Sequence, residues 1–170
     1  PDSIIAVSAH YDHLGRMGDE VYFPGANDNA AGVAMLLDFA KHFSENPPKK
    51  TMVFMAFGAE ESGILGSRFF VENPLFKLQR LNFIINLDVI GTGTDGIMVV
   101  NGADLPQAFA LLESCNEKKY VPEIKKRKNA PNSDHFWFAQ KGIPAFFIYG
   151  LGGGTAYHDI DDTSDKLQLE

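Results

Sequence analysis

Short apolar runs alternate along the chain with segments in which apolar residues recur every three or four positions. The runs predict buried strands over residues 3–9, 52–57, 83–87, 97–100 and 144–149. The helical spacing predicts helices over 29–43, 105–118 and 133–140, and one that passes through 69–71. Strands and helices in this order predict an α/β fold with a mostly parallel central β-sheet and helices on both faces.

Three segments between these elements predict loops. Residues 11–27 contain three glycines and a proline, and the Asn-Pro-Pro of residues 46–48 ends the first helix. The glycine-rich segment 150–154 follows the last strand. We expect this segment either to shape the mouth of a cleft or to act as a mobile connector.

Histidine and acidic residues follow several of the predicted strands. His10 ends the first strand, Glu60 and Glu61 follow the second, and Asp88 follows the third. In parallel α/β sheets, ligands bind in the loops at the carboxyl ends of the strands. We therefore expect these side chains to converge at one edge of the sheet.

Each acidic residue taken alone has a structural explanation. Asp28 fits a helix cap, and Glu60 and Glu61 fit the favourable interaction of acids with a helix start. Converging carboxylates, however, repel one another unless a cation lies among them, and zinc takes histidine nitrogen and carboxylate oxygen as ligands. We predict a metal site with five ligands, which is enough for two ions: His10, Asp28, Glu61, Asp88 and His158.

Composition and charge narrow the function classes. The 170 residues are 45% hydrophobic and 22% charged, which is typical of one ordered globular domain over residues 1–170. The net charge of −7 argues against a nucleic-acid partner, and we expect the basic run 125–128 to be a solvated loop. Cys115 is the single cysteine and its surroundings predict a helix. No apolar run is long enough for a membrane span, and the start at Pro1 without a signal-peptide pattern indicates a fragment or a mature portion.

Four stretches carry a family resemblance: residues 10–15 (His-Tyr-Asp-His-Leu-Gly), 24–33, 60–67 and 86–88. In this order they resemble the two-zinc aminopeptidases of peptidase family M28, which contains bacterial leucyl aminopeptidase. Ser-Asp-His at 133–135, Gly-Ile-Pro at 142–144, Tyr-His at 157–158 and Asp-Thr at 162–163 extend the resemblance over nearly the whole chain.

The resemblance implies a zinc-dependent exopeptidase fold of the phosphorylase/hydrolase-like type, with two Zn²⁺ per chain. Asp28 would bridge the ions, His10 and Asp88 would complete one site, and Glu61 and His158 would complete the other. It also implies a cis peptide bond after Asp28.

The implied activity is hydrolysis of the N-terminal bond of a peptide with a free amine. Glu60 would be the general base that deprotonates a water shared by the ions and later protonates the leaving amine. Asp12 is placed to accept the hydrogen bond from the second ring nitrogen of His10, a supporting catalytic role. Tyr149 and Tyr157 are both candidates for stabilising the oxyanion.

Substrate recognition has several candidates. Asp134 suits a free amine, but Ser133-Asp134 also fits a supporting role or a helix start. Five aromatic residues near the end of the chain could line an apolar pocket, yet only one or two of them can face a substrate, and the others are predicted core: Phe136, Trp137, Phe138, Phe146 and Phe147.

Two alternatives belong to other functional classes: a glutaminyl-cyclase-like acyltransferase with one zinc ion, and a non-catalytic peptidase-like binding domain. The presence of His10 beside Asp28 and Asp88 favours two metals, and the complete ligand set with Glu60 favours an enzyme. The resemblance also implies export to the periplasm, surface or medium. Elements expected before the first strand and after Thr163 are missing, so we expect a fold truncated at both ends.

Overall fold

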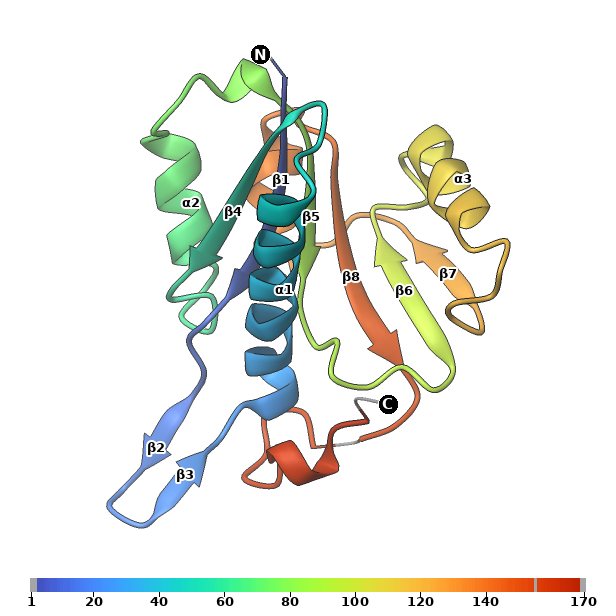
Figure 1. The fold of residues 1–170 in the computed structure, drawn as a ribbon. Helices are drawn as coiled ribbons and strands as arrows, with labels where there is room; N and C mark the ends of the chain where they lie inside the picture. Colours follow the sequence, from blue (N-terminus) through green and yellow to red (C-terminus); the bar gives the residue numbers. More distant parts are fainter. Residues whose placement is uncertain (1–2, 155, 169–170) are drawn as a thin grey trace.

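Parallel strands bring four carboxyl ends to one edge of a six-stranded sheet in the computed structural model, which describes residues 3–154 and 156–168 (Figure 1). The strands lie in this order: β4 (Thr51–Phe57), β1 (Ile4–His10), β5 (Leu81–Leu87), β8 (Ala145–Leu151), β6 (Gly96–Val100) and β7 (Ile124–Arg127). In this sheet, over the residues that the structure describes, every neighbouring pair of strands is parallel except β6 with β8. The predicted mostly parallel α/β sheet is therefore confirmed.

Helices cover both faces of this sheet, as predicted. One face carries α1 (Ala31–Glu45) and α3 (Pro106–Cys115), and the other carries α2 (Leu65–Glu72) and α4 (His135–Gln140). The alternation of side chains along a strand decides this division: Ala6 of β1 packs with the α2 and α4 cluster, whereas Val7 packs with α1. Figure 1 shows α1 crossing in front of β1 and β5.

Apolar side chains from both elements fill each interface. Phe138 of α4, which is fully buried, packs against Phe57 of β4 and Phe70 of α2 with ring centroids about 6 Å apart. On the opposite face Leu36 of α1 packs with Val7 and the end of β5. These packed faces hold the strand ends, and the residues that follow them, in fixed positions.

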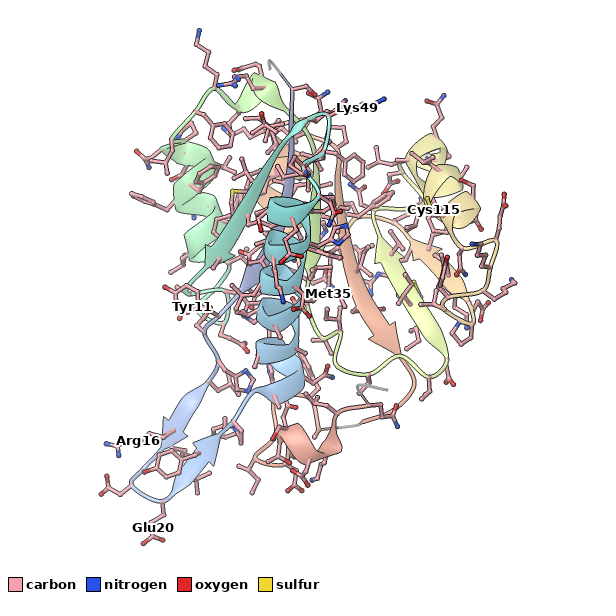
Figure 2. The ribbon with its side chains drawn as sticks, in the orientation of Figure 1. Tyr11, Arg16, Glu20, Met35, Lys49 and Cys115 are labelled. Atoms are coloured by element: carbon pink, nitrogen blue, oxygen red, sulfur yellow. The ribbon has the colours of Figure 1, made fainter. Side chains whose placement is uncertain are left out.

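Several boundaries differ from the predicted ones. The segment 11–27 is not all loop, because β2 (Gly15–Met17) and β3 (Val21–Phe23) form an antiparallel hairpin there. Figure 2 shows Arg16 and Glu20 pointing away from the molecule on this hairpin. Both strands are short and mostly exposed, so they leave no apolar pattern in the sequence. The first helix begins at Ala31 rather than residue 29, because an irregular helical turn over Ala26–Ala30 precedes it.

Two corrections concern the second half of the chain. The basic run 125–128 was expected to be a solvated loop, but β7 covers most of it as a parallel strand at the edge of the sheet. An edge strand with exposed lysines lacks the buried face that a sequence pattern reveals. β8 continues to Leu151 instead of ending at Tyr149. Cys115 lies in a helix, as predicted: it is the last residue of α3, and its side chain is exposed. Among the described helices none has the length and apolar character needed to cross a membrane.

Candidate metal centre

The strand order places the predicted ligands at one edge of the sheet. His10 is the last residue of β1, Asp88 directly follows β5, and Glu60 and Glu61 follow β4. His158 lies beyond β8, whose carboxyl end reaches the same edge because β8 runs parallel to β5. The start of α1 and the end of the described chain lie at this edge as well (Figure 1).

The first group of donor atoms surrounds His10. Its Nε2 atom lies 3.2 Å from Oδ1 of Asp28 and 3.2 Å from Oδ1 of Asp88. All three residues are buried, with exposed fractions of 1%, 3% and 5%. This group contains the residues that the resemblance assigned to one metal site.

The second group lies on the other side of Asp28. Nε2 of His158 is 3.2 Å from Oδ2 of Asp28 and 3.0 Å from Oε2 of Glu61. Asp28 therefore directs one carboxylate oxygen to each histidine, and the fold brings together all five predicted ligands. The His158 side chain is 36% exposed, so this side of the centre opens to solvent.

These residues fit zinc by type and by spacing. Two donor atoms of one tetrahedral zinc ion, each about 2.0–2.1 Å from it, lie about 3.3 Å apart. The N···O separations of 3.0–3.2 Å in both groups are close to this value. The pKa of His10 supports a cation here: burial lowers it, but hydrogen bonds with Asp28 and Asp88 outweigh the burial and raise the pKa to about 11. The carboxylates thus create a place that favours positive charge.

Asp12 supports the centre in a different way from the predicted one. Its main-chain oxygen, 3.1 Å from Nδ1 of His10, takes the place expected for its carboxylate, which lies 3.7 Å away. The carboxylate instead accepts hydrogen bonds from the main-chain N–H groups of Glu60 and Glu61, at 3.1 and 3.2 Å. These two bonds hold the turn after β4 close to β1, so Asp12 orients both His10 and the two glutamates.

Glu60 stands beside the donor atoms without being one of them. Burial raises the pKa of its carboxyl to about 8; the charge of His10 lowers it, and Asp88, Asp134 and Glu61 raise it further. A carboxyl group whose pKa lies near neutral is suited to accept and return a proton.

A buried chain of hydrogen bonds orients Asp88. The Ser133 hydroxyl donates to Oδ2 of Asp88 at 2.6 Å, the Asn86 amide donates to Ser133 at 2.6 Å, and the Ser8 hydroxyl donates to Asn86 at 2.7 Å. Because Ser133 accepts from Asn86, its own proton is left for Asp88. Ser8 and Asn86 had no predicted role, since such pairings depend on which strands are neighbours.

The turn that carries Asp28 is fixed from two sides. Both carboxylate oxygens of Asp162 accept main-chain N–H groups, from Asn27 at 2.8 Å and from Asp28 at 3.0 Å. The Asn29 side chain donates to the main-chain oxygen of Leu87 at 2.9 Å, which links the turn to the end of β5. The peptide bond between Asp28 and Asn29 is cis, as predicted from the resemblance.

Asp134 does not have the geometry of a helix cap or of an open receptor. It precedes α4 but makes no capping hydrogen bond through its side chain, and it is fully buried. Burial raises the pKa of its carboxyl to about 6; the Ser67 hydroxyl and His10 lower it, while Asp88 and Asp12 raise it.

Among the aromatic candidates Phe138, Phe146 and Phe147 are buried, in agreement with the core prediction.

His13 is a further residue at the centre, and it had no predicted role. Its Nδ1 atom lies 2.9 Å from Oε1 of Glu61 and 3.9 Å from Oδ2 of Asp28. The three residues offer donor atoms close enough to hold one ion. A second histidine three positions after His10 was the available signal, but only the backbone path after β1 decides that it turns inward.

A family model described as peptidase family M28 matches residues 1–170. The chain belongs to peptidase family M28. Aminopeptidase YwaD of Bacillus subtilis is 34% identical to this M28 chain over 179 residues, a region that includes 100% of the chain and 38% of YwaD. The chain thus spans well under half the length of this relative.

Solved structures agree with the fold of the M28 chain. The zinc aminopeptidase BSAP of Bacillus subtilis superposes with a TM-score of 0.83 at 27% identity, over 98% of this chain and 42% of that one. A glutaminyl cyclase of Bacteroides thetaiotaomicron, bound to N-acetylhistamine, gives a TM-score of 0.81 at 21% identity, over 98% of this chain and 68% of that one. The likeness to the cyclase concerns the fold alone.

Proposed function

We propose that this M28 chain is the catalytic portion of an aminopeptidase that holds two zinc ions and removes the N-terminal residue of a peptide. One observation carries the proposal: the two carboxylate oxygens of Asp28 face different histidines, His10 and His158, each at 3.2 Å. A carboxylate arranged in this way suits a bridge between two ions. The names of the relatives, aminopeptidase and zinc aminopeptidase, agree with this assignment.

The residues divide between the two ions as follows. His10, Asp28 and Asp88 would hold one, and Asp28, Glu61 and His158 would hold the other. Zinc bound here supplies Lewis acidity, which polarises a substrate carbonyl and lowers the pKa of water. The chain provides orientation, because Asp12 and Ser133 fix the ligands on either side.

Glu60 is the proposed general base. The main-chain N–H of Glu60 donates a hydrogen bond to the carboxylate of Asp12 and so holds Glu60 at the centre. Glu60 belongs to neither of the two groups of donor atoms. Its carboxylate takes a proton from the attacking water and delivers it to the leaving amine. Burial, which raises its pKa, favours the protonated form that the second transfer needs.

Tyr157 is the better placed of the two tyrosine candidates for an oxyanion. Its ring stacks on the ring of His158, with centroids 4.0 Å apart. Although the residue is 64% exposed, partial burial and the carboxylates of Asp28, Asp88 and Glu61 raise the pKa of its hydroxyl, so this group stays a hydrogen-bond donor. The ring of Tyr149, in contrast, packs against Phe147. We therefore expect Tyr157→Phe to lower kcat more than Tyr149→Phe.

Recognition of a free amine belongs to the same proposal. The centre gathers more carboxylates than two ions need for charge balance, and a substrate ammonium group is a natural partner for them. Asp134 is too buried to meet a substrate, which leaves Glu60, which is only partly buried, for this role. A substrate whose amine is acetylated should therefore be a poor one.

The test combines activity with metal content. Glu60→Gln should lower hydrolysis of aminoacyl anilides by about two to four orders of magnitude while zinc content stays unchanged. Glu72→Gln is the matched control, since Glu72 is exposed on α2 and pairs with Arg68 on the surface. Full activity of the Glu60 variant would exclude the proposed base.

Asp28→Ala tests the bridge. We expect two zinc ions in the wild-type chain, with both zinc and activity lost in this variant. A wild-type chain with one zinc ion and acyltransferase activity would indicate the cyclase-like alternative. A chain that takes up no metal and hydrolyses no anilide after zinc addition would indicate a binding domain.

A further inference from the structure

His13 lies close to the centre although the hairpin that follows it projects into solvent. The residue comes three positions after the end of β1, and its side chain is 9% exposed. Its ring meets the ring of His158 edge to face, with centroids 5.9 Å apart. The imidazole is therefore turned inward, towards the group formed by Asp28, Glu61 and His158.

The contact between His13 and Glu61 is short but is not a hydrogen bond. Nδ1 of His13 lies 2.9 Å from Oε1 of Glu61, yet neither this oxygen nor either ring nitrogen has a partner in hydrogen-bonding geometry among the described residues. Buried polar atoms left without a partner cost about 1–3 kcal/mol each. Two unpaired donor atoms that converge at this distance are arranged as neighbouring ligands of one cation.

The main chain leaves room for this imidazole. A Cβ atom at Gly25 would lie 2.6 Å from Cγ and 2.8 Å from Cδ2 of the His13 ring. Gly25 also has a positive φ of 67°, which side chains rarely adopt. The ring thus rests against the backbone of the same turn that carries Asp28.

We propose that His13 is a fourth protein ligand of the metal site formed by Asp28, Glu61 and His158. This inference rests on the proposed function, because that function places an ion there. With His13 this site has two imidazoles and two carboxylates, whereas the His10 site has one imidazole and two carboxylates. A closed set of four ligands with two nitrogens retains zinc firmly, so we expect this site to be the tighter of the two.

The first experiment measures zinc affinity by competition with a chelator. We expect the wild-type chain to bind two zinc ions with unequal affinity and His13→Ala to weaken the tighter one by about tenfold or more. His42→Ala is the control, since His42 lies exposed near the end of α1, and both affinities should stay unchanged in it. Unchanged affinities in His13→Ala would overturn the proposal.

The second experiment distinguishes a His13 that binds the metal from a His13 that only lies beside it. It uses the wild-type chain, so it does not depend on whether a variant folds. Nitrogen NMR of histidine-labelled wild-type chain should show Nδ1 of His13 moving to a metal-bound position when zinc is added. A His13 signal that does not respond to zinc would contradict ligation. If the chain binds one ion and the His13 signal responds, the two-ion proposal fails while this inference stands. If the chain binds two ions and the His13 signal does not respond, the two-ion proposal stands while this inference fails.

Discussion

Replacement of Asp162 by asparagine tests how Asp28, the proposed bridging ligand, is held. Each carboxylate oxygen of Asp162 accepts one main-chain N–H, from Asn27 at 2.8 Å and from Asp28 at 3.0 Å, and the residue is 4% exposed. Asparagine keeps one oxygen and places an NH₂ group where the other was. A main-chain N–H then faces a second donor in a buried position.

The expected loss follows from these two bonds. A hydrogen bond to a charged group contributes about 1.5–3 kcal/mol, and a buried donor without an acceptor costs about 1–3 kcal/mol. One hydrogen bond is lost, and the other now has an uncharged amide oxygen as its acceptor. We therefore expect the free energy of unfolding to fall by about 2–4 kcal/mol. Zinc affinity should fall as well, because the turn positions Asp28.

Urea unfolding of the metal-free chain measures this change, and chelator competition measures the affinity. Asp161→Asn is the control: Asp161 is exposed and forms a surface ion pair with Lys166 at 3.1 Å, which contributes less than about 1 kcal/mol. The reasoning is refuted if Asp162→Asn and Asp161→Asn unfold at the same urea concentration and bind zinc equally.

Three further predictions concern stability of the metal-free chain, measured by urea unfolding. Phe138→Ala should lower the free energy of unfolding by about 3–5 kcal/mol because Phe138 is fully buried, whereas Phe69→Ala on the exposed side of α2 should change it by less than about 0.5 kcal/mol. Burial lowers the pKa of His135 from 6.5 to about 4, so the stability that its neutral form provides is complete above pH 6.5 and is lost as the pH falls towards 4. Over that range the free energy of unfolding should fall by about 3 kcal/mol more in wild type than in His135→Gln. An equal dependence of the unfolding free energy on pH in both proteins would contradict this prediction. Burial raises the pKa of Asp134 from 3.8 to about 6, which penalises the ionised form, so Asp134→Asn should be more stable than wild type at pH 8 and lose that advantage by pH 4.

The sequence alone predicted most of the sheet and the set of candidate metal ligands. Buried parallel strands are continuous apolar runs, and residues that follow their carboxyl ends share one edge, so His10, Asp88 and the pair Glu60-Glu61 could be grouped from the order of these runs. Elements with little buried surface were not predicted in this way. The hairpin of β2 and β3 and the edge strand β7 carry exposed side chains and so lack the pattern.

Only the tertiary structure decided how the candidate ligands are supported. The roles of Asp162 and Asn86 depend on hydrogen bonds between residues far apart in sequence, and the inward turn of His13 depends on the backbone path around Gly25. The carboxylate of Asp12 likewise joins the glutamates instead of His10, because the turn after β4 passes beside it. A local pattern reports which side chains an element buries; it does not report which distant polar group each buried side chain meets.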